Sequence, residues 1–341
     1  MDKEQLQKSI DDANIRSLTN GAANRILQLL QVLRYNNNEN SVKRWVWELC
    51  QNAKDVCNNT GKVKICICFD PKSNKVIFKH NGKAFSMDNL ISLINQVSSK
   101  EKAEGENRKS GKFGTGFLTT HLLSEIVNVS GILENEECKL SRFNITLDRT
   151  GHERDTIIAS LENTIRQLHE CIPLLEGEEI CTDEYNTVFE YELNSDGVEV
   201  ARQGVENLRV SAPYVLAMLR DIEEIYLEAT DEVYRYIGEY HCELDNASVH
   251  EISYRVGDST ESIFVLNLSE DDTVIMISLE RTEEGVCIKP YDKNQSRLFC
   301  DFPLIGTETF PFPFQYWYGL EYLIQQNQEM VYTLSVIQRK K

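Results

Sequence analysis

The expected fold depends most on the run Trp45-Val46-Trp47-Glu48-Leu49-Cys50-Gln51-Asn52-Ala53-Lys54-Asp55. Its apolar residues recur at the spacing of an amphipathic helix. At 3.6 residues per turn, Glu48, Asn52 and Asp55 fall within an arc of about 60° beside the apolar stripe. The run therefore predicts a helix that carries an amide and two carboxylates in a column at the edge of a core.

That polar column suits two kinds of chemistry. Mg²⁺ prefers oxygen ligands and keeps several waters, and a carboxylate can orient a water for attack. An ordinary amphipathic helix with a polar flank gives the same pattern, so the column alone leaves both interpretations open. We expect Ser41 to be the N-cap of this helix and its end to lie near Asn58-Asn59-Thr60-Gly61.

The composition of the whole chain indicates the class of protein. The 341 residues suggest about two domains, and 41% hydrophobic with 26% charged residues is typical of a soluble globular chain. No run of about 18 apolar residues occurs, and the first residues are polar. We therefore expect no membrane segment, no secretory signal and a cytoplasmic location.

Charge and cysteine usage argue against some kinds of site. The ten cysteines form no Cys-x-x-Cys pair and the six histidines do not combine with them, which argues against a zinc site and a disulfide framework. The net charge of −18 disfavours nucleic acid as a partner, because phosphate contacts need Lys and Arg. A polyanionic nucleotide would need local donors that overcome the same field.

Helices and strands are expected to alternate before a change of pattern near residue 222. We expect helices at 3–13, 21–34, 155–170 and 198–220, another after Ser86 or Asp88, and strands at 63–69, 76–79, 126–133, 138–147 and 187–191. The later part predicts β-runs at 225–227, 249–256, 262–268 and 274–279, separated by acidic turns. The change places a domain boundary at 215–222.

A charged segment from Ser98 to Lys112 leads into a glycine-rich turn. A solvated loop is the plain interpretation of that segment, and a nucleotide lid is the functional one. The turn, Gly111-Lys112-Phe113-Gly114-Thr115-Gly116-Phe117, opens an expected helix at 118–126. Glycines let phosphates approach the backbone, and a helix N-terminus offers unpaired N–H groups, so this turn suits phosphate binding.

The order of these motifs resembles that of the GHKL ATPase superfamily, whose members share the Bergerat fold. Glu-x-x-x-Asn-x-x-Asp on a helix is followed by His80-Asn81-Gly82 after a strand, then by the charged loop, the glycine-rich turn and a strand led by Thr187. The likeness is strongest to the heat-shock-chaperone-like ATP-binding domains of sacsin and of large bacterial ATP-binding proteins. It covers about residues 20–220, and more weakly 299–308.

The resemblance implies an α+β fold. Residues 1–220 would form a two-layer α/β sandwich with helices over a mixed sheet, and the nucleotide would bind between the layers. Residues 221–314 would form a smaller, β-rich, transducer-like domain that looks incomplete, and residues 315–341 a C-terminal tail.

The resemblance also implies residue roles, with ATP and Mg²⁺ as cofactors. Glu48 matches the carboxylate that activates water, Asn52 matches the amide that ligates Mg²⁺, and Asp55 matches an acidic position nearer the base and sugar. The other matched positions would bind the nucleotide: His80, Asn81 and Gly82 at the base, Gly111, Phe113, Gly114, Thr115, Gly116 and Phe117 at the phosphates, and Thr187 in the sheet beneath the adenine. Lys100 and Lys112 would be lid lysines that reach phosphate, although a solvated lysine is the default for each.

One position departs from the superfamily pattern. The residue before Asn-Gly is usually an Asp that accepts a hydrogen bond from the adenine amino group, and here it is His80. A neutral imidazole accepts one hydrogen bond but supplies no carboxylate. Adenine selectivity is therefore an open question, with Asp55 or Asn81 as alternative acceptors and a purely structural role as the other interpretation of His80.

Two functions follow from the resemblance. The first is a Mg-ATP-dependent ATPase whose conformational change drives a chaperone-like or switch cycle. The second is a nucleotide-binding interaction module with little or no hydrolysis, in a truncated member of a larger multidomain family. Either would act on an unidentified protein client or partner, and a homodimer is one open arrangement. A histidine kinase is disfavoured because residues 1–40 contain no His, and a P-loop protein because its glycine-lysine motif is missing.

Overall fold

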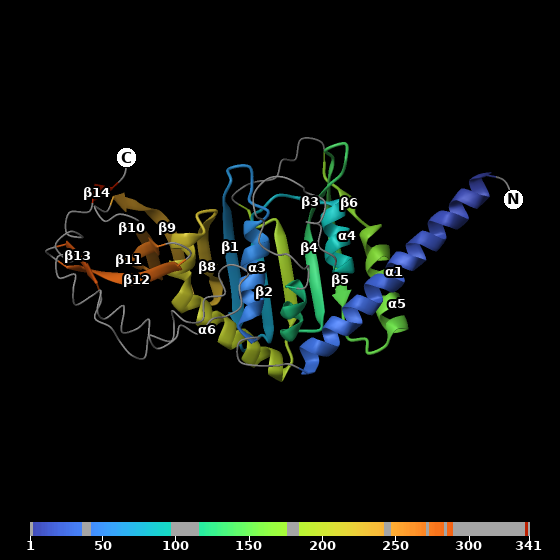
Figure 1. Cartoon of the computed structure of the whole chain (residues 1–341), viewed down its shortest axis with the longest axis horizontal. Coiled ribbons are helices and arrows are strands. Elements are labelled where there is room, and N and C mark those ends of the chain that lie inside the picture. Colours follow the sequence, from blue (N-terminus) through green and yellow to red (C-terminus); the bar gives the residue numbers. More distant parts are fainter. Residues whose placement is uncertain are drawn as a thin grey trace. The chain divides into compact units, whose positions relative to one another are not determined.

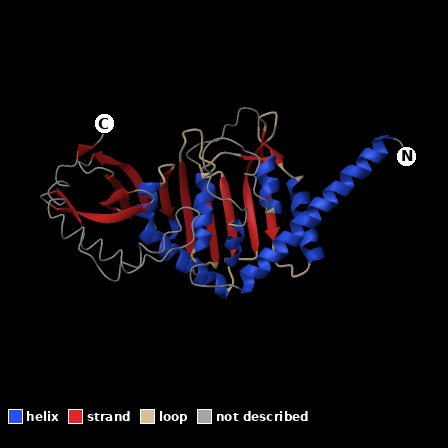
Figure 2. Ribbon diagram, in the orientation of Figure 1, coloured by secondary structure: helices blue, strands red, loops and turns tan. Residues whose placement is uncertain are grey.

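The computed structural model describes residues 3–35, 42–96, 116–175, 184–241, 247–270, 273–282, 285–288 and 338–339. They form an α+β structure in which helices accompany a large mixed sheet (Figure 1, Figure 2). The predicted α+β class is therefore confirmed. The chain divides into two compact units, one of residues 1–60 and 67–205 and the other of residues 61–66 and 206–341. The domain limits at 220 and 314 stay predictions.

The sheet of the first unit has the strand order β1-β2-β7-β4-β5-β6. These strands are β1 (Val63–Asp70), which the unit boundary divides, β2 (Lys75–His80), β7 (Thr187–Glu192), β4 (Ile126–Glu134), β5 (Leu140–Asp148) and β6 (Ile172–Pro173). The short β3 (Phe85–Ser86) pairs with β4 in parallel. The pairs β2–β7, β4–β7 and β5–β6 are antiparallel. Alternate residues of β2 and β7 are buried, so one face of this sheet is covered more fully than the other.

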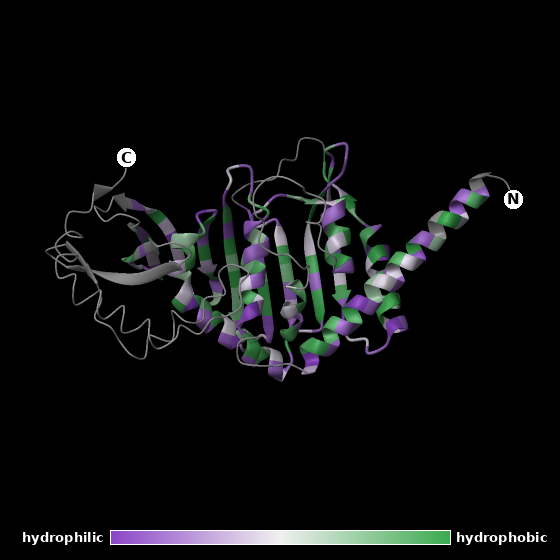
Figure 3. Cartoon of the chain, in the orientation of Figure 1, coloured by the Kyte–Doolittle hydropathy of each residue, from purple (hydrophilic) through white to green (hydrophobic). Residues whose placement is uncertain are grey.

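Helices supply the cover of that face. They are α3 (Arg44–Lys54), α4 (Met87–Asn95), α5 (Arg154–Leu168), the first part of α6 (Ser195–Met218), the 3-10 helix η2 (Phe117–Leu122) and the second half of α1 (Lys3–Tyr35), where its buried residues lie. Within this layer α1 packs on α4, α5 and η2, α3 packs on η2, and α5 packs on β5. In Figure 3 the central strands of this unit are largely hydrophobic, while the helices alternate hydrophobic and hydrophilic residues.

Trp45 fixes α3 in the core of the first unit. Its side chain is fully buried, and its indole N–H donates to the carbonyl of Val200 in α6 at 3.1 Å. A Cβ on Gly204, one turn further along α6, would lie 2.6 Å from Cε2 of the indole and closer still to Nε1. The close approach of the two helices therefore requires glycine at this position.

Several sequence expectations need correction or completion. The two helices expected at 3–13 and 21–34 are one continuous helix, α1, because no proline interrupts it and Gly21 is tolerated. The helix expected at 118–126 is the short η2, which ends at Leu122 before β4 begins. α3 ends at Lys54, earlier than expected. Ser86 is confirmed as a cap, since its hydroxyl accepts from the Asn89 N–H at 3.2 Å, and Ser41 lies outside the described residues.

The second unit is an antiparallel sheet of hairpins. The strands β8 (Ile222–Leu227), β9 (Glu232–His241), β10 (Ala247–Val256), β11 (Ser259–Glu270), β12 (Thr273–Thr282) and β13 (Gly285–Ile288) pair in chain order, and β14 (Gln338–Arg339) pairs with β9. The β-runs expected from 225 to 279 are thus confirmed. β9 was not expected from the sequence, and it joins β8 to β10 in this sheet.

Candidate functional site

Glu48 and Gly116 are in direct contact, although 68 positions separate them in the sequence. A Cβ built on Gly116 would lie 2.6 Å from Cδ of Glu48 and closer still to its Oε2. Gly116 stands at the start of η2, and Glu48 lies on the face of α3 that packs against η2. The last glycine of the predicted phosphate-binding turn therefore borders the predicted water-activating carboxylate.

Gly82 approaches the chain just beyond the other end of α3. A Cβ on Gly82 would lie 2.5 Å from the carbonyl oxygen of Val56 and 2.8 Å from Nδ1 of His80. The next residue, Lys83, donates its N–H to the same Val56 carbonyl at 2.8 Å. The backbone after β2 is thus fastened to the residue that follows the predicted polar column.

Asn52 lies between these two contacts. Glu48 and Val56 are eight residues apart, and the six residues from Glu48 to the end of α3 at Lys54 rise by about 9 Å. Asn52 is exposed midway between them, and Asp55 is half-buried at the C-cap of α3. The flank of α3 therefore presents an exposed amide with a glycine backbone near each end.

Aromatic side chains connect the two ends beneath this flank. Phe117 follows Gly116 and packs on Phe189 of β7, with ring centroids 5.6 Å apart. Phe189 stacks in turn on the His80 ring at 6.4 Å with an interplanar angle of 28°. His80 and Thr187 are direct neighbours across the β2–β7 pairing, and both are buried. The sequence predicted all of these residues except Phe189, which the period-2 alternation from Thr187 could have revealed.

His80 is buried and neutral. It is 3% exposed, and burial lowers the pKa of its ring from the ordinary 6.5 to about 3. Its Nδ1 accepts a hydrogen bond from the Gly82 N–H at 3.1 Å. This hydrogen bond holds the turn that carries Gly82. His80 therefore has the structural role that the sequence left open.

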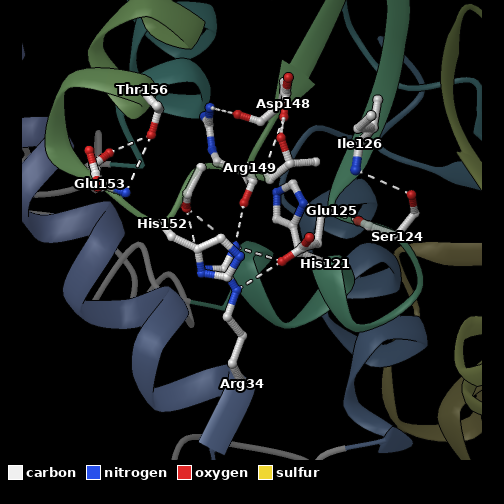
Figure 4. Close-up of polar contacts among 12 residues, drawn as sticks. Arg34, His121, Ser124, Glu125, Ile126, Asp148, Arg149, His152, Glu153 and Thr156 are labelled. Atoms are coloured by element: carbon white, nitrogen blue, oxygen red, sulfur yellow. Dashed lines mark hydrogen bonds and ion pairs between the residues drawn. The ribbon is translucent and has the colours of Figure 1, made fainter.

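A partly buried polar cluster holds the other end of η2 (Figure 4). Arg34 of α1 donates to the Glu125 carboxylate at 2.8 Å and to the Arg149 carbonyl at 2.8 Å. The Arg149 side chain is fully buried and donates to the carbonyl of Ile94, near the C-terminus of α4, at 2.7 Å. His121 of η2 donates from Nδ1 to the Ser124 carbonyl at 3.2 Å. These bonds join α1, α4 and the segment after η2, and so fix the position of η2 beside α3.

Glu48 also has a cationic neighbour on its own helix. Nη2 of Arg44 lies 3.6 Å from Oε1 of Glu48, one turn earlier on α3. The Glu48 side chain is 19% exposed and the Arg44 side chain is 54% exposed. Sequence reasoning missed Arg44, although its i, i+4 spacing from Glu48 is the signal that could have identified it.

The remaining predicted positions differ in what the structure says of them. Asn81 is buried beside His80, and Gly82, Gly116, Phe117 and Thr187 lie as described above. Lys100, Gly111, Lys112, Phe113, Gly114 and Thr115 lie outside the described residues. Within the described ranges, no group of three His, Cys, Asp or Glu side chains has the geometry of a metal site. None of the helices described there has the length and apolar character needed to span a membrane.

A separate hollow lies on the sheet of the second unit. It has a volume of about 500 Å³ and is lined by residues of β8 to β11 that include Glu224, Arg235 and Arg255. Arg235 pairs with Glu224, and Arg255 pairs with Asp231 at 3.1 Å. The hydrogen bonds from Arg255 lower the pKa of the Asp231 carboxyl. The lining cations are thus already neutralised, and the hollow contains none of the residues predicted from the sequence.

No protein-family model matches this chain, and no curated protein matches it.

Proposed function

We propose that the first unit binds a nucleoside triphosphate with Mg²⁺ along the polar flank of α3 and hydrolyses it. The observation that carries this proposal is the contact of Gly116 with Glu48 at one end of the flank and of Gly82 with Val56 at the other. Two glycine backbones converge on one helix, with an exposed amide between them. Backbone without a Cβ is the surface that phosphates and flat bases can approach most closely.

Each described residue of the proposed site would have a separate role. Glu48 would accept a proton from the attacking water at Oε2 or Oε1, as a general base does. Asn52 would contribute its amide oxygen to Mg²⁺, which neutralises charge on the phosphates and is otherwise ligated by water. Gly116 would border the terminal phosphate, while His80, Asn81, Gly82 and Thr187 would enclose the base.

The arrangement supports the resemblance to GHKL ATPases. We propose the Bergerat fold for the first unit and a transducer-like role for the second unit. The resemblance implies ATP as the nucleotide, but His80 leaves the choice of base open. On this proposal, nucleotide turnover would drive a chaperone-like or switch cycle on a protein client. The helical layer over one face of the sheet, with the motif residues between the two, is the feature that supports it.

Binding with little hydrolysis is the second candidate, and the Arg44–Glu48 pair favours it. The Arg44 guanidinium, 3.6 Å from Oε1, occupies one side of the carboxylate that an attacking water would have to reach. The two candidates differ in one measurable quantity, which is the turnover of bound nucleotide.

Isothermal titration calorimetry with and without Mg²⁺ tests the site. The titrants are ATP, GTP and a non-hydrolysable analogue, and phosphate release is followed in parallel. We expect Asn52→Ala to abolish Mg²⁺-dependent binding, because it removes the exposed amide between the glycine contacts. We expect Glu48→Ala to retain binding and to lose turnover.

Matched controls come from the same unit. Asn24→Ala removes an exposed helical amide from α1, and Glu162→Ala removes an exposed helical carboxylate from α5. Both should bind and turn over nucleotide as the wild type does. Equal Mg²⁺-dependent affinity in wild type and Asn52→Ala would refute the site, while tight binding without wild-type turnover would select the second candidate.

A further inference from the structure

The hydrogen bond from Gly82 determines which nitrogen of His80 carries the proton. A backbone N–H can only donate, so Nδ1 of His80, 3.1 Å away, must be the acceptor. The ring is neutral, because burial lowers its pKa to about 3. A neutral imidazole with a bare Nδ1 carries its proton on Nε2. Across the pH range of most proteins, His80 therefore presents an N–H donor and no second acceptor.

The position of His80 makes it the fixed polar group at the base end of the flank. It lies on the buried face of the sheet, beside Thr187 and stacked on Phe189. Glu48 and Gly116 occupy the opposite end, where a carboxylate and Mg²⁺ chemistry belong. The Gly82 turn and Val56 close over the His80 end. Aromatic side chains beside a fixed polar group suit contact with a nucleobase.

Among the described residues, the Gly82 N–H is the hydrogen-bonding partner of this ring, and it occupies only Nδ1. Nε2–H is left as a donor whose orientation is set by the backbone bond on the other side of the ring. Thr187 can rotate its hydroxyl to donate or accept, and so imposes no choice between bases. The Nε2–H of His80 cannot become an acceptor, so it does impose a choice between bases.

We propose that His80 selects the base, by donating Nε2–H to a purine that carries a carbonyl oxygen at C6, and that the site therefore prefers guanine or hypoxanthine nucleotides to adenine nucleotides. This inference depends on the proposed function, because it assumes that a nucleotide binds along α3. Adenine carries an amino group at C6, which would place two donors face to face. A buried donor left without an acceptor is costly, so the discrimination should reach about tenfold or more in Kd.

Calorimetry with inosine triphosphate and ATP in the presence of Mg²⁺ tests the preference. The hypoxanthine base differs from adenine at C6 and in the proton on N1, and lacks the second amino group of guanine, so it isolates this edge. We expect the wild type to bind inosine triphosphate at least about tenfold more tightly than ATP. His80→Asp replaces the donor with an acceptor and should reverse the order. His80→Asn can present either group and should remove most of the preference.

A second measurement does not depend on those variants. The ¹⁵N chemical shifts of the His80 ring, recorded on the wild type, should show a protonated Nε2 and a bare Nδ1 from pH 5 to 8. The Nε2 proton should shift when inosine triphosphate is added. A protonated Nδ1 would overturn the inference directly, and so would a charged ring.

The outcomes separate the inference from the function on which it depends. ATP that binds the wild type as tightly as inosine triphosphate, or more tightly, overturns the base preference and leaves nucleotide binding in place. If no triphosphate binds with any base, the proposed function fails, and the inference fails with it. A wild-type preference for inosine triphosphate that His80→Asp reverses supports both.

Discussion

Replacing Gly116 with alanine perturbs the carboxylate of Glu48 without perturbing the backbone. Gly116 has φ −60° and ψ −47°, an ordinary helical conformation that alanine prefers. The added methyl group would lie 2.6 Å from Cδ of Glu48, so this side chain must swing away. Because the far end of a Glu side chain is flexible, the displacement costs little folding energy.

We therefore expect Gly116→Ala to change the free energy of unfolding little and to lower kcat strongly. Gly→Ala at a compatible helical position stabilises by about 0.4–1 kcal/mol, and a shifted rotamer of Glu48 offsets about 0.5–1.5 kcal/mol of this. We expect the net change in the free energy of unfolding to stay within about 1 kcal/mol. Displacing a general base by about 1 Å lowers kcat on the order of 100-fold.

Two assays check the reasoning, one of them independent of function. Phosphate release gives kcat, and urea denaturation gives the free energy of unfolding for Gly116→Ala, Glu48→Ala and the double variant. Removing the Glu48 side chain removes the collision, so Gly116→Ala should be more favourable in that background by about 1 kcal/mol. Effects that add within about 0.3 kcal/mol would show that the two residues are not in contact. Unchanged kcat in Gly116→Ala would refute the catalytic role of Glu48.

Two further predictions concern stability. Gly204→Ala forces a methyl group into the buried Trp45 indole and should destabilise by about 2–4 kcal/mol in urea denaturation, from overpacking and a strained hydrogen bond. Gly21→Ala, which meets nothing within 4 Å, is the matched control and should be neutral or stabilising. Burial lowers the pKa values of His80 and His121 from 6.5 to about 3, so between these values the unfolded chain binds protons that the folded chain does not. The free energy of unfolding should therefore fall as the pH drops from about 6.5 towards 3, by about 1.4 kcal/mol per pH unit for each histidine. His121→Gln should remove its share of that slope, and a slope unchanged by the substitution would contradict the burial argument.

The periodicity of apolar residues predicted most of the secondary structure. The apolar spacing around Trp45 predicted α3, and alternation predicted β1, β2, β7 and the later hairpins, because each pattern repeats with the geometry of its own element. The limits of elements were less predictable. α1 runs through a stretch without strong periodicity because its later residues pack on α4 and α5, and η2 stops short because β4 must begin at Ile126.

The sequence by itself determined which residue types were available: two carboxylates, an amide, glycines and a histidine before Asn81-Gly82. Only the tertiary structure decided that Gly116 borders Glu48 and that Gly82 closes on Val56, because the layering of helices on the sheet brings these distant positions together. The tertiary structure also decided the protonation state of the His80 ring. The proton sits on Nε2 because the turn aims a backbone N–H at Nδ1 and burial keeps the ring neutral.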